Sequence, residues 1–293
     1  MSDLHEYLEQ KKREVNQALD LHLPGEETRP ARLHEAMRYT VFAGGKRLRP
    51  ALCLAACEAV GGTDEAAMLP AIALEILHTY TLVHDDLPAM DDDDLRRGMP
   101  TAHIKYGEAL AILTGDALLT LAFQWLAECE APPPYVPNQL SLELAAASGS
   151  QGIIAGQVED LAAEGVEPDQ ALVDYIHLHK TAALFRASIR IGAICGSARS
   201  EELDALTLYG CNLGLAFQIV DDILDETSTD EELGKPIGSD REKDKATYVA
   251  LLGIDAARKK AETLIESAME QLKGVRHPDR LQQIAERVLS RSN

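Results

Sequence analysis

Apolar residues recur every three or four positions along almost the whole chain, which is the period of an amphipathic α-helix. Good helix formers dominate the composition, and runs of β-branched residues are short. Two stretches, 64–86 and 201–227, are largely apolar until acidic residues at their ends, which is typical of helices buried among other helices. Proline and glycine clusters separate the periodic segments. The pattern predicts helices near 3–20, 28–42, 48–60, 64–86, 107–129, 137–163, 168–196, 201–227, 246–273 and 278–291.

These segments predict an all-α bundle of about ten or more helices. No Ser/Gly linker and no change of composition divides the chain, so we expect a single domain over residues 1–293. The one long irregular stretch, Thr227 to Lys245, is highly charged and contains Gly234 and Gly238. We interpret this stretch as a cover over a site.

Charge and cysteine content narrow the classes of function. The 28 basic and 48 acidic side chains give a net charge of −20, which argues against a nucleic-acid binder and against attraction to anionic membranes. Five scattered cysteines fit a reducing cytoplasm. We see no signal peptide and no run of about 18 apolar residues, so we expect a cytoplasmic chain that does not insert into a membrane.

Two aspartate clusters end the two apolar stretches. In the second cluster, Asp221 and Asp225 are four residues apart and share one helix face with Gln218, with Asp222 beside them. Like charges at this spacing repel each other, and the C-terminal end of a helix disfavours anions. The arrangement opposes stability unless a cation binds there, so it indicates function.

The first cluster runs from Asp85 and Asp86 to Asp91 and on through Asp94. Pro88 disfavours helical geometry at Leu87, so we expect a kink that brings Asp91 back beside Asp85. A single acidic run of this kind is more often a solvated loop. Two runs, each at the end of a buried helix, favour a pair of carboxylate groups that face each other across Mg²⁺ carrying a phosphate ligand.

Taken together, these motifs resemble those of the short-chain isoprenyl diphosphate synthases, and most of all the bacterial type of farnesyl diphosphate synthase. The motifs are Asp-Asp, four residues, Asp, then Leu95-Arg96-Arg97-Gly98, paired with Gln-x-x-Asp-Asp-x-x-Asp at 218–225. The resemblance extends from Gly44-Gly45-Lys46 to Tyr248. It implies the isoprenoid synthase fold, with helices around a central cavity. It also implies a reaction that joins an allylic diphosphate to isopentenyl diphosphate with loss of pyrophosphate.

The resemblance also assigns roles to individual residues. Three magnesium ions per site would be held by Asp85, Asp91 and Asp221, with Asp86, Asp222 and Asp225 completing the motifs directly or through water. The allylic diphosphate would contact Arg96, Lys180, Lys235 and Lys245. Isopentenyl diphosphate would contact Lys46, Arg49, His78 and Arg97. Thr181 and Gln218 would present neutral oxygens to the allylic cation, and together with Lys180 they form the expected catalytic set.

Product length should depend on the depth of the apolar pocket below the first cluster. Tyr80 lies five residues before Asp85, roughly 7–8 Å down a helix, and Thr81 is its neighbour. Because similar farnesyl synthases carry a bulky aromatic residue here, we expect a fifteen-carbon product. A geranylgeranyl diphosphate synthase is the alternative, and a terpene cyclase or a non-catalytic synthase subunit is a weaker one. The family is usually homodimeric, and we expect a homodimer here.

Overall fold

The computed structural model describes residues 2–227 and 245–290, and nearly all of the elements in these ranges are helices. The first half contains α1 (Ser2–His22), α2 (Ala31–Phe42), α3 (Leu48–Ala59), α4 (Asp64–Asp85), β1 (Leu95–Arg96), β2 (Met99–Pro100), α5 (Ala102–Tyr106) and α6 (Glu108–Ala127). The second half contains α7 (Gln139–Ser148), α8 (Ile153–Ala162), α9 (Gln170–Ile176), η1 (His177–Ala182), α10 (Ala183–Cys195), α11 (Ser200–Thr227), α14 (Tyr248–Leu252), α15 (Ile254–Gln271), η2 (Leu272–Gly274) and α16 (Asp279–Leu289). The predicted all-α fold is confirmed.

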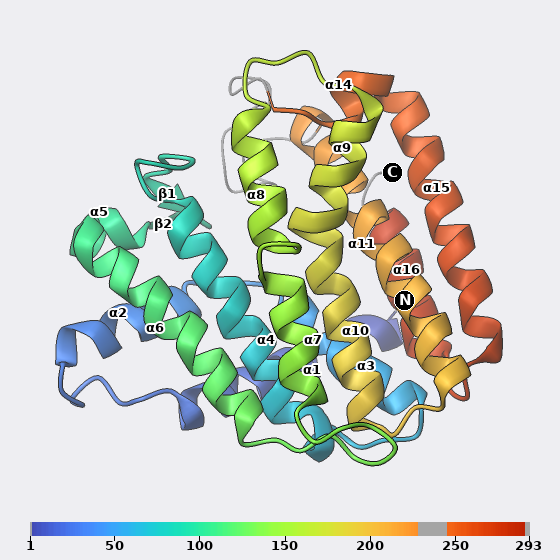
Figure 1. Cartoon of the computed structure of the whole chain (residues 1–293), viewed down its shortest axis with the longest axis horizontal. Coiled ribbons are helices and arrows are strands. Elements are labelled where there is room, and N and C mark those ends of the chain that lie inside the picture. The colour runs from blue at the N-terminus through green and yellow to red at the C-terminus, as the bar shows by residue number, and fades with distance from the viewer. Residues whose placement is uncertain (1, 228–244, 291–293) are drawn as a thin grey trace.

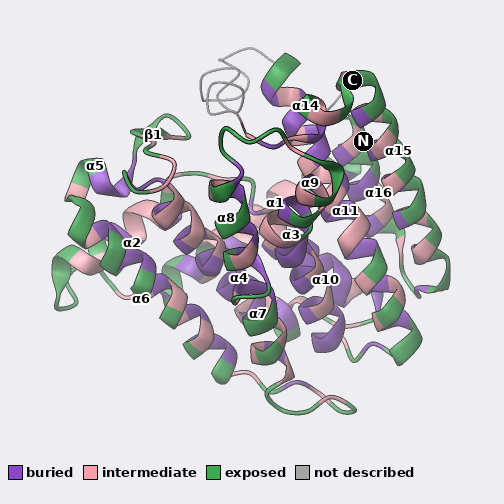
Figure 2. Ribbon diagram, turned by 45° about the horizontal axis from the view of Figure 1, so that its top comes forward, coloured by how far each residue is buried: buried purple, intermediate pink, exposed green. Residues whose placement is uncertain are grey.

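The long helices lie side by side, with α6 near one edge of the molecule and α15 at the other (Figure 1). Helix α4 packs against α6 and α3, α10 packs against α3 and α11, and α11 packs against α15. Two clusters of buried apolar side chains result, one around α4, α6 and α7 and the other around α11, α15 and α16. Helices α3 and α10 contribute to both clusters, and their residues are almost all buried (Figure 2).

Several predicted helices differ from the observed ones. The segment 137–163 is divided into α7 and α8 at Gly149 to Gly152. The segment 246–273 is divided into α14 and α15 at Gly253, whose φ of 79° favours glycine. The segment 168–196 is continuous, but a turn of π-helix, η1, lies between α9 and α10.

The only strands among the described residues form a hairpin that the periodicity did not predict, β1 and β2, paired through Leu95 with Pro100 and Arg96 with Met99. Its two loop residues, Arg97 and Gly98, both have positive φ, at 55° and 76°. A two-residue loop of this kind matches the twist of a hairpin. The hairpin therefore fixes where the Arg96-Arg97 pair stands.

The expectation of no long apolar run was wrong. Three helices, α4, α6 and α11, are long and apolar enough to cross a membrane by length and composition alone. The most apolar window of α4 is 61% buried inside the chain, whereas that of α6 is only 39% buried. Helix α6 therefore exposes apolar surface that the described part of the chain does not cover.

Candidate active site

The first aspartate cluster folds back on itself. Helix α4 ends at Asp85 rather than kinking at Pro88 as we predicted, and the chain turns immediately. The backbone N–H of Asp91 donates to the carbonyl of Asp85 at 2.8 Å, and that of Asp92 donates to Leu87 at 3.1 Å. Asp85 and Asp91 are therefore brought together, as the position of Pro88 had indicated.

This acidic pair stands in a charged setting. Burial raises the pKa of Asp85 to about 6, with smaller contributions from Asp91 and Asp86, while Lys180 and Arg96 oppose the increase. Arg96 donates from Nε to Oδ1 of Asp86 at 2.6 Å. Lys245 places its Nζ 3.3 Å from Oδ1 of Asp91. Cations from three separate parts of the chain thus converge on the end of α4.

In the second cluster, Gln218 and Asp222 form hydrogen bonds with other parts of the chain. Thr181 donates from Oγ1 to Oε1 of Gln218 at 2.7 Å, and Gln218 donates from Nε2 to Oδ1 of Asp222 at 2.8 Å. The other oxygen of Asp222 accepts the backbone N–H of Tyr248 at 3.2 Å. Asp222 and Asp225 are buried, and Asp221 is half-buried. Asp222 thus joins Gln218 to the segment that carries Lys245.

Lys180 and Thr181 lie in the π-helical turn η1. Helix α8 approaches this turn closely at Gly156, where an added Cβ would lie 2.2 Å from the backbone N of Lys180. From the same helix, Asp160 accepts a hydrogen bond from Nζ of Lys180 at 2.5 Å. Isolated π-turns are frequent at functional sites. The α8 segment resembles a stretch that, in the family resembled, usually begins with two glycines. Here the first glycine is replaced by Ala155, which is half-buried. The second, Gly156, is retained and is the residue that lies against the backbone of Lys180.

A second cationic region lies earlier along α4. Arg97 donates to the carbonyl of Gly44, and an added Cβ on Gly45 would lie 2.6 Å from its guanidinium. Arg49 lies over the ring of Phe185, 5.3 Å from its centre, and burial lowers its pKa to about 10. Burial and then Arg49, Arg97 and other arginines hold the pKa of His78 well below its ordinary value. Lys46, three residues before Arg49 in the chain, is exposed.

The residues predicted to set product length lie on α4 between the two regions. Tyr80 is buried, and its ring meets that of His84 edge-on with centroids 5.2 Å apart. His84 contacts the carbonyl of Ile112 on α6 at 3.0 Å, at a place where Gly115 leaves room for the imidazole. Thr81 donates from Oγ1 to the carbonyl of His78. Lys235 lies outside the described residues.

In the described ranges, no three His, Cys, Asp or Glu side chains form a ready metal-binding group. The donor chemistry nevertheless fits Mg²⁺, since Asp85 and Asp91 supply adjacent hard oxygen ligands. Burial and neighbouring carboxylates disfavour ionisation of Asp85, and a divalent cation would reverse that effect.

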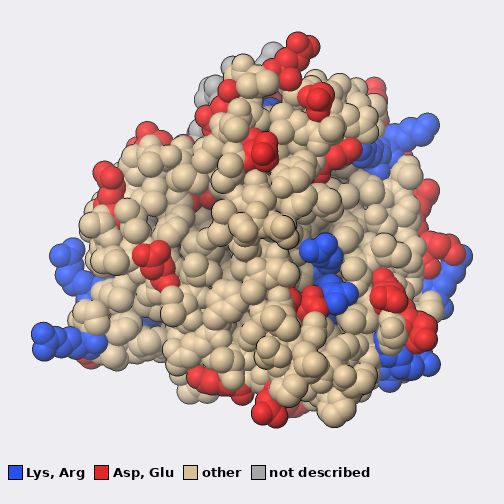
Figure 3. Space-filling model, viewed as in Figure 1, with Lys and Arg blue, Asp and Glu red and all other residues tan. Residues whose placement is uncertain are grey.

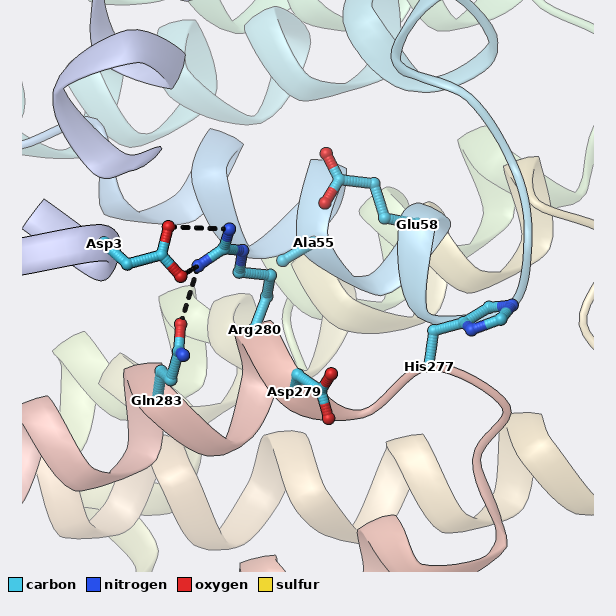
Figure 4. Close-up of a pocket in the computed structure, with 7 residues that line it drawn as sticks. All are labelled: Asp3, Ala55, Glu58, His277, Asp279, Arg280 and Gln283. Carbon is cyan, nitrogen blue, oxygen red and sulfur yellow. Dashed lines mark hydrogen bonds and ion pairs between the residues drawn. The ribbon is translucent and has the colours of Figure 1, made fainter. Parts of the chain in front are cut away.

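A separate polar pocket lies between α1, α3 and α16 (Figure 4). Its lining includes Asp3, Glu58, His277 and Arg280, and none of the predicted site residues. Arg280 donates to Asp3 and to Gln283, so its charge is already partnered. This pocket is not the site indicated by the motifs.

Comparison with known proteins identifies the family. The profile of the polyprenyl synthetase family matches residues 30–288. The chain belongs to this family.

Individual relatives and solved structures also match this chain over most of its length. The chain is 48% identical over 278 residues to the heterodimeric geranylgeranyl pyrophosphate synthase large subunit 1 of Arabidopsis thaliana, covering 93% of this chain and 74% of that one. Other plant relatives are also named geranylgeranyl pyrophosphate synthases. An FPP/GFPP synthase from Zymomonas mobilis superposes with a TM-score of 0.86 at 38% identity, covering 98% and 99% of the two chains. A Helicobacter pylori geranyltransferase, solved with magnesium and an isoprenyl diphosphate, gives 0.84 at 34% identity, covering 97% and 96%.

These relatives show that the chain is a short-chain prenyltransferase of the isoprenoid synthase fold. They favour the geranylgeranyl alternative over the farnesyl product that we expected from the sequence.

Sequence reasoning missed three groups that hold the site together: Asp160 against Lys180, the π-turn itself, and a buried pair formed by Arg47 and Glu75. Glu75 had a detectable signal, since it is a charged residue in the middle of an apolar stretch. Asp160 carries no comparable signal in the sequence. No periodicity marks a single π-turn.

Proposed function

We propose that this prenyltransferase joins an allylic diphosphate to isopentenyl diphosphate, with magnesium bound at the aspartate clusters. One observation carries the proposal: two separate cationic regions lie along α4, and only one of them adjoins an acidic pair. Two diphosphate groups need two such regions, and only the group that leaves needs a metal beside it.

The allylic diphosphate is assigned to the region at the end of α4. Asp85, Asp91 and Asp221 would hold magnesium, which when bound would supply positive charge beside the departing pyrophosphate. Asp86 is already paired with Arg96, and Asp222 with Gln218 and Tyr248, so both are assigned supporting roles. Lys180, Lys245 and Lys235 would bind the same diphosphate as point charges.

Isopentenyl diphosphate is assigned to Lys46, Arg49, His78 and Arg97. Two guanidinium groups can grip phosphate oxygens in bidentate fashion. Burial, reinforced by the neighbouring arginines, lowers the pKa of His78, so it would serve as a hydrogen-bond donor rather than as a cation.

Thr181 and Gln218 would face the allylic cation. Their mutual hydrogen bond and the one to Asp222 fix the direction of the amide dipole. A preset dipole stabilises developing charge without forming a covalent adduct.

The test is an assay with purified protein, geranyl or dimethylallyl diphosphate, isopentenyl diphosphate and magnesium. We expect turnover only with both substrates and with the metal present. Asp85→Asn should lower kcat by about 100-fold or more, whereas Asp94→Asn, in the exposed part of the same acidic run, should stay within about twofold. Consumption of geranyl diphosphate alone would instead identify a terpene cyclase, and no turnover at all a non-catalytic subunit.

For product length we propose geranylgeranyl diphosphate, supported by the names of the plant relatives. Farnesyl diphosphate is the second candidate, favoured by the buried ring of Tyr80 below the first cluster. Chromatography of the products made from dimethylallyl and isopentenyl diphosphates separates the two.

We further propose that the chain works as a homodimer in the cytoplasm without inserting into a membrane. The exposed apolar surface of α6 supports a partner chain. Because one plant relative is named as a subunit of a heterodimer, the composition of the assembly needs its own measurement.

A further inference from the structure

Arg47 is the buried charged residue of the Gly44–Pro50 segment, and from the start of α3 it contacts three other helices. It is 4% exposed and has a left-handed backbone with φ of 51° at the start of α3. Its guanidinium donates to Asn16 of α1 at 2.9 Å, to the carbonyl of Val41 in α2 at 2.6 Å and to Glu75 of α4 at 2.8 Å. A non-glycine residue keeps a positive φ only where its surroundings impose it.

Glu75 is the matching anion. Its side chain and that of Arg47 are each 3% exposed, so the two form a buried ion pair. Burial lowers the pKa values of Arg49 and Arg97, and the charge of Glu75 opposes that decrease, whereas Arg47 lowers the pKa of Arg97 further. One carboxylate therefore stabilises three guanidinium groups, those of buried Arg47, half-buried Arg49 and exposed Arg97, and an excess of positive charge remains for a ligand.

The two partners flank the proposed isopentenyl diphosphate region. Arg47 stands between Lys46 and Arg49 in the chain, and Glu75 lies one helical turn before His78 on α4. The pair thus ties the segment that carries two of the four proposed ligands to the helix that carries the third. Arg49 itself packs over the ring of Phe185, and its buried Nε has no hydrogen-bond partner in the described chain.

We propose that Arg47 and Glu75 are positioning residues for the isopentenyl diphosphate subsite, setting the start of α3 against α4 so that Lys46, Arg49 and His78 converge on one diphosphate. The inference rests on the proposed function, and it assigns neither residue to direct contact with substrate.

The test replaces the pair as a unit. A buried ion pair tolerates joint replacement by apolar residues much better than the loss of one partner, so the double variant Arg47→Met/Glu75→Met should fold even if each single variant does not. We expect KM for isopentenyl diphosphate to rise about tenfold or more, because Lys46, Arg49 and His78 are no longer held in the right relative positions. KM for the allylic diphosphate should stay within about twofold. Arg47→Lys, which keeps the charge but not the three-way contact, should give an intermediate KM.

A matched control is the ion pair Arg190–Glu143, which joins α10 to α7 rather than α3 to α4. Arg190→Met/Glu143→Met should leave both KM values within about twofold. An unchanged KM for isopentenyl diphosphate in the Arg47/Glu75 double variant, or an equal rise for both substrates, would overturn the positioning role. Failure of the proposed function would look different, since the unmodified protein itself would then show no turnover that depends on isopentenyl diphosphate.

Discussion

At the scale of single residues, the site depends on side chains whose partners lie far away in the sequence. Lys245 reaches Asp91 across 154 positions, and Lys180 reaches Asp160 across 20. The motifs indicated which residues matter, because paired carboxylates next to apolar helices demand a cation. They could not indicate Asp160 or Arg47, because a buried ion pair leaves no periodic trace in a sequence, and Glu75 was marked only as a charged residue within an apolar stretch.

Tyr80 gives the most direct prediction at this scale. Replacing it with alanine removes the ring that packs against His84, so a growing chain gains room along α4. We expect Tyr80→Ala to lengthen the longest product by at least one isoprene unit, measured by chromatography of the dephosphorylated alcohols. Tyr80→Phe keeps the ring and should leave the product unchanged. An identical product spectrum for the alanine variant would remove Tyr80 from the floor of the pocket.

Glu202 gives a prediction about acid stability. Burial disfavours its ionised form, but hydrogen bonds from Arg199 and Arg276 outweigh burial and lower its pKa to about 2. A depressed carboxyl pKa stabilises the folded state above the unfolded value, and that contribution is lost as the pH falls from about 4.5 towards 2.

The measurement is chemical unfolding as a function of pH. Glu202→Gln should cost about 2 kcal/mol near neutral pH, and the difference from the unmodified protein should shrink as the pH falls through this window. A difference that stays constant with pH would show that the charge of Glu202 is not what stabilises the fold.

At the scale of elements, the π-turn η1 is the least regular helical segment and carries two of the proposed catalytic residues. Its position depends on α8, which comes close because Gly156 has no side chain. The positions of the helices could be predicted from the sequence, because their apolar period is strong. The points at which these helices are interrupted could not be predicted, since a break at Gly253 or a single π-turn depends on local backbone geometry and tertiary packing.

Gly156→Ala tests this contact. The added methyl group would overlap the backbone of Lys180, so α8 and η1 must separate. We expect a loss of about 1–3 kcal/mol in the free energy of unfolding, together with a lower kcat as Lys180 shifts. Gly274→Ala is the matched control, because nothing lies within 4 Å of the methyl group there, and it should change stability by less than about 0.5 kcal/mol. A fully active Gly156→Ala variant would contradict the close packing.

At the scale of the whole molecule, one face is poor in charge. Figure 3 shows a broad area with few charged side chains over the region where α6, α7 and α8 lie. Large apolar side chains are exposed on these helices, among them Ile112, Leu113, Leu142 and Val158. A stable interface buries about 800 Å² per partner, and contiguous apolar surface of this kind marks such interfaces.

The dimer proposal predicts that charges on α6 separate the chains. Ile112→Lys combined with Leu113→Lys should convert a dimer to a monomer, as measured by sedimentation velocity. Leu208→Lys changes an equally exposed leucine of α11 and should leave the assembly intact. A monomer in the unmodified protein, or a dimer that survives both lysines, would rule out α6 as the interface.

The order of residues along helix α4 links substrate binding to product length. It carries Glu75, His78, Tyr80 and Asp85 in that order, and each step along its axis is about 1.5 Å. Under the proposed assignment, one helix positions both substrates, through His78 and Asp85, and also limits the length of the hydrocarbon, through Tyr80. Evolution can therefore change the length of the product by substituting a single side chain along α4, without changing the residues that carry out the condensation.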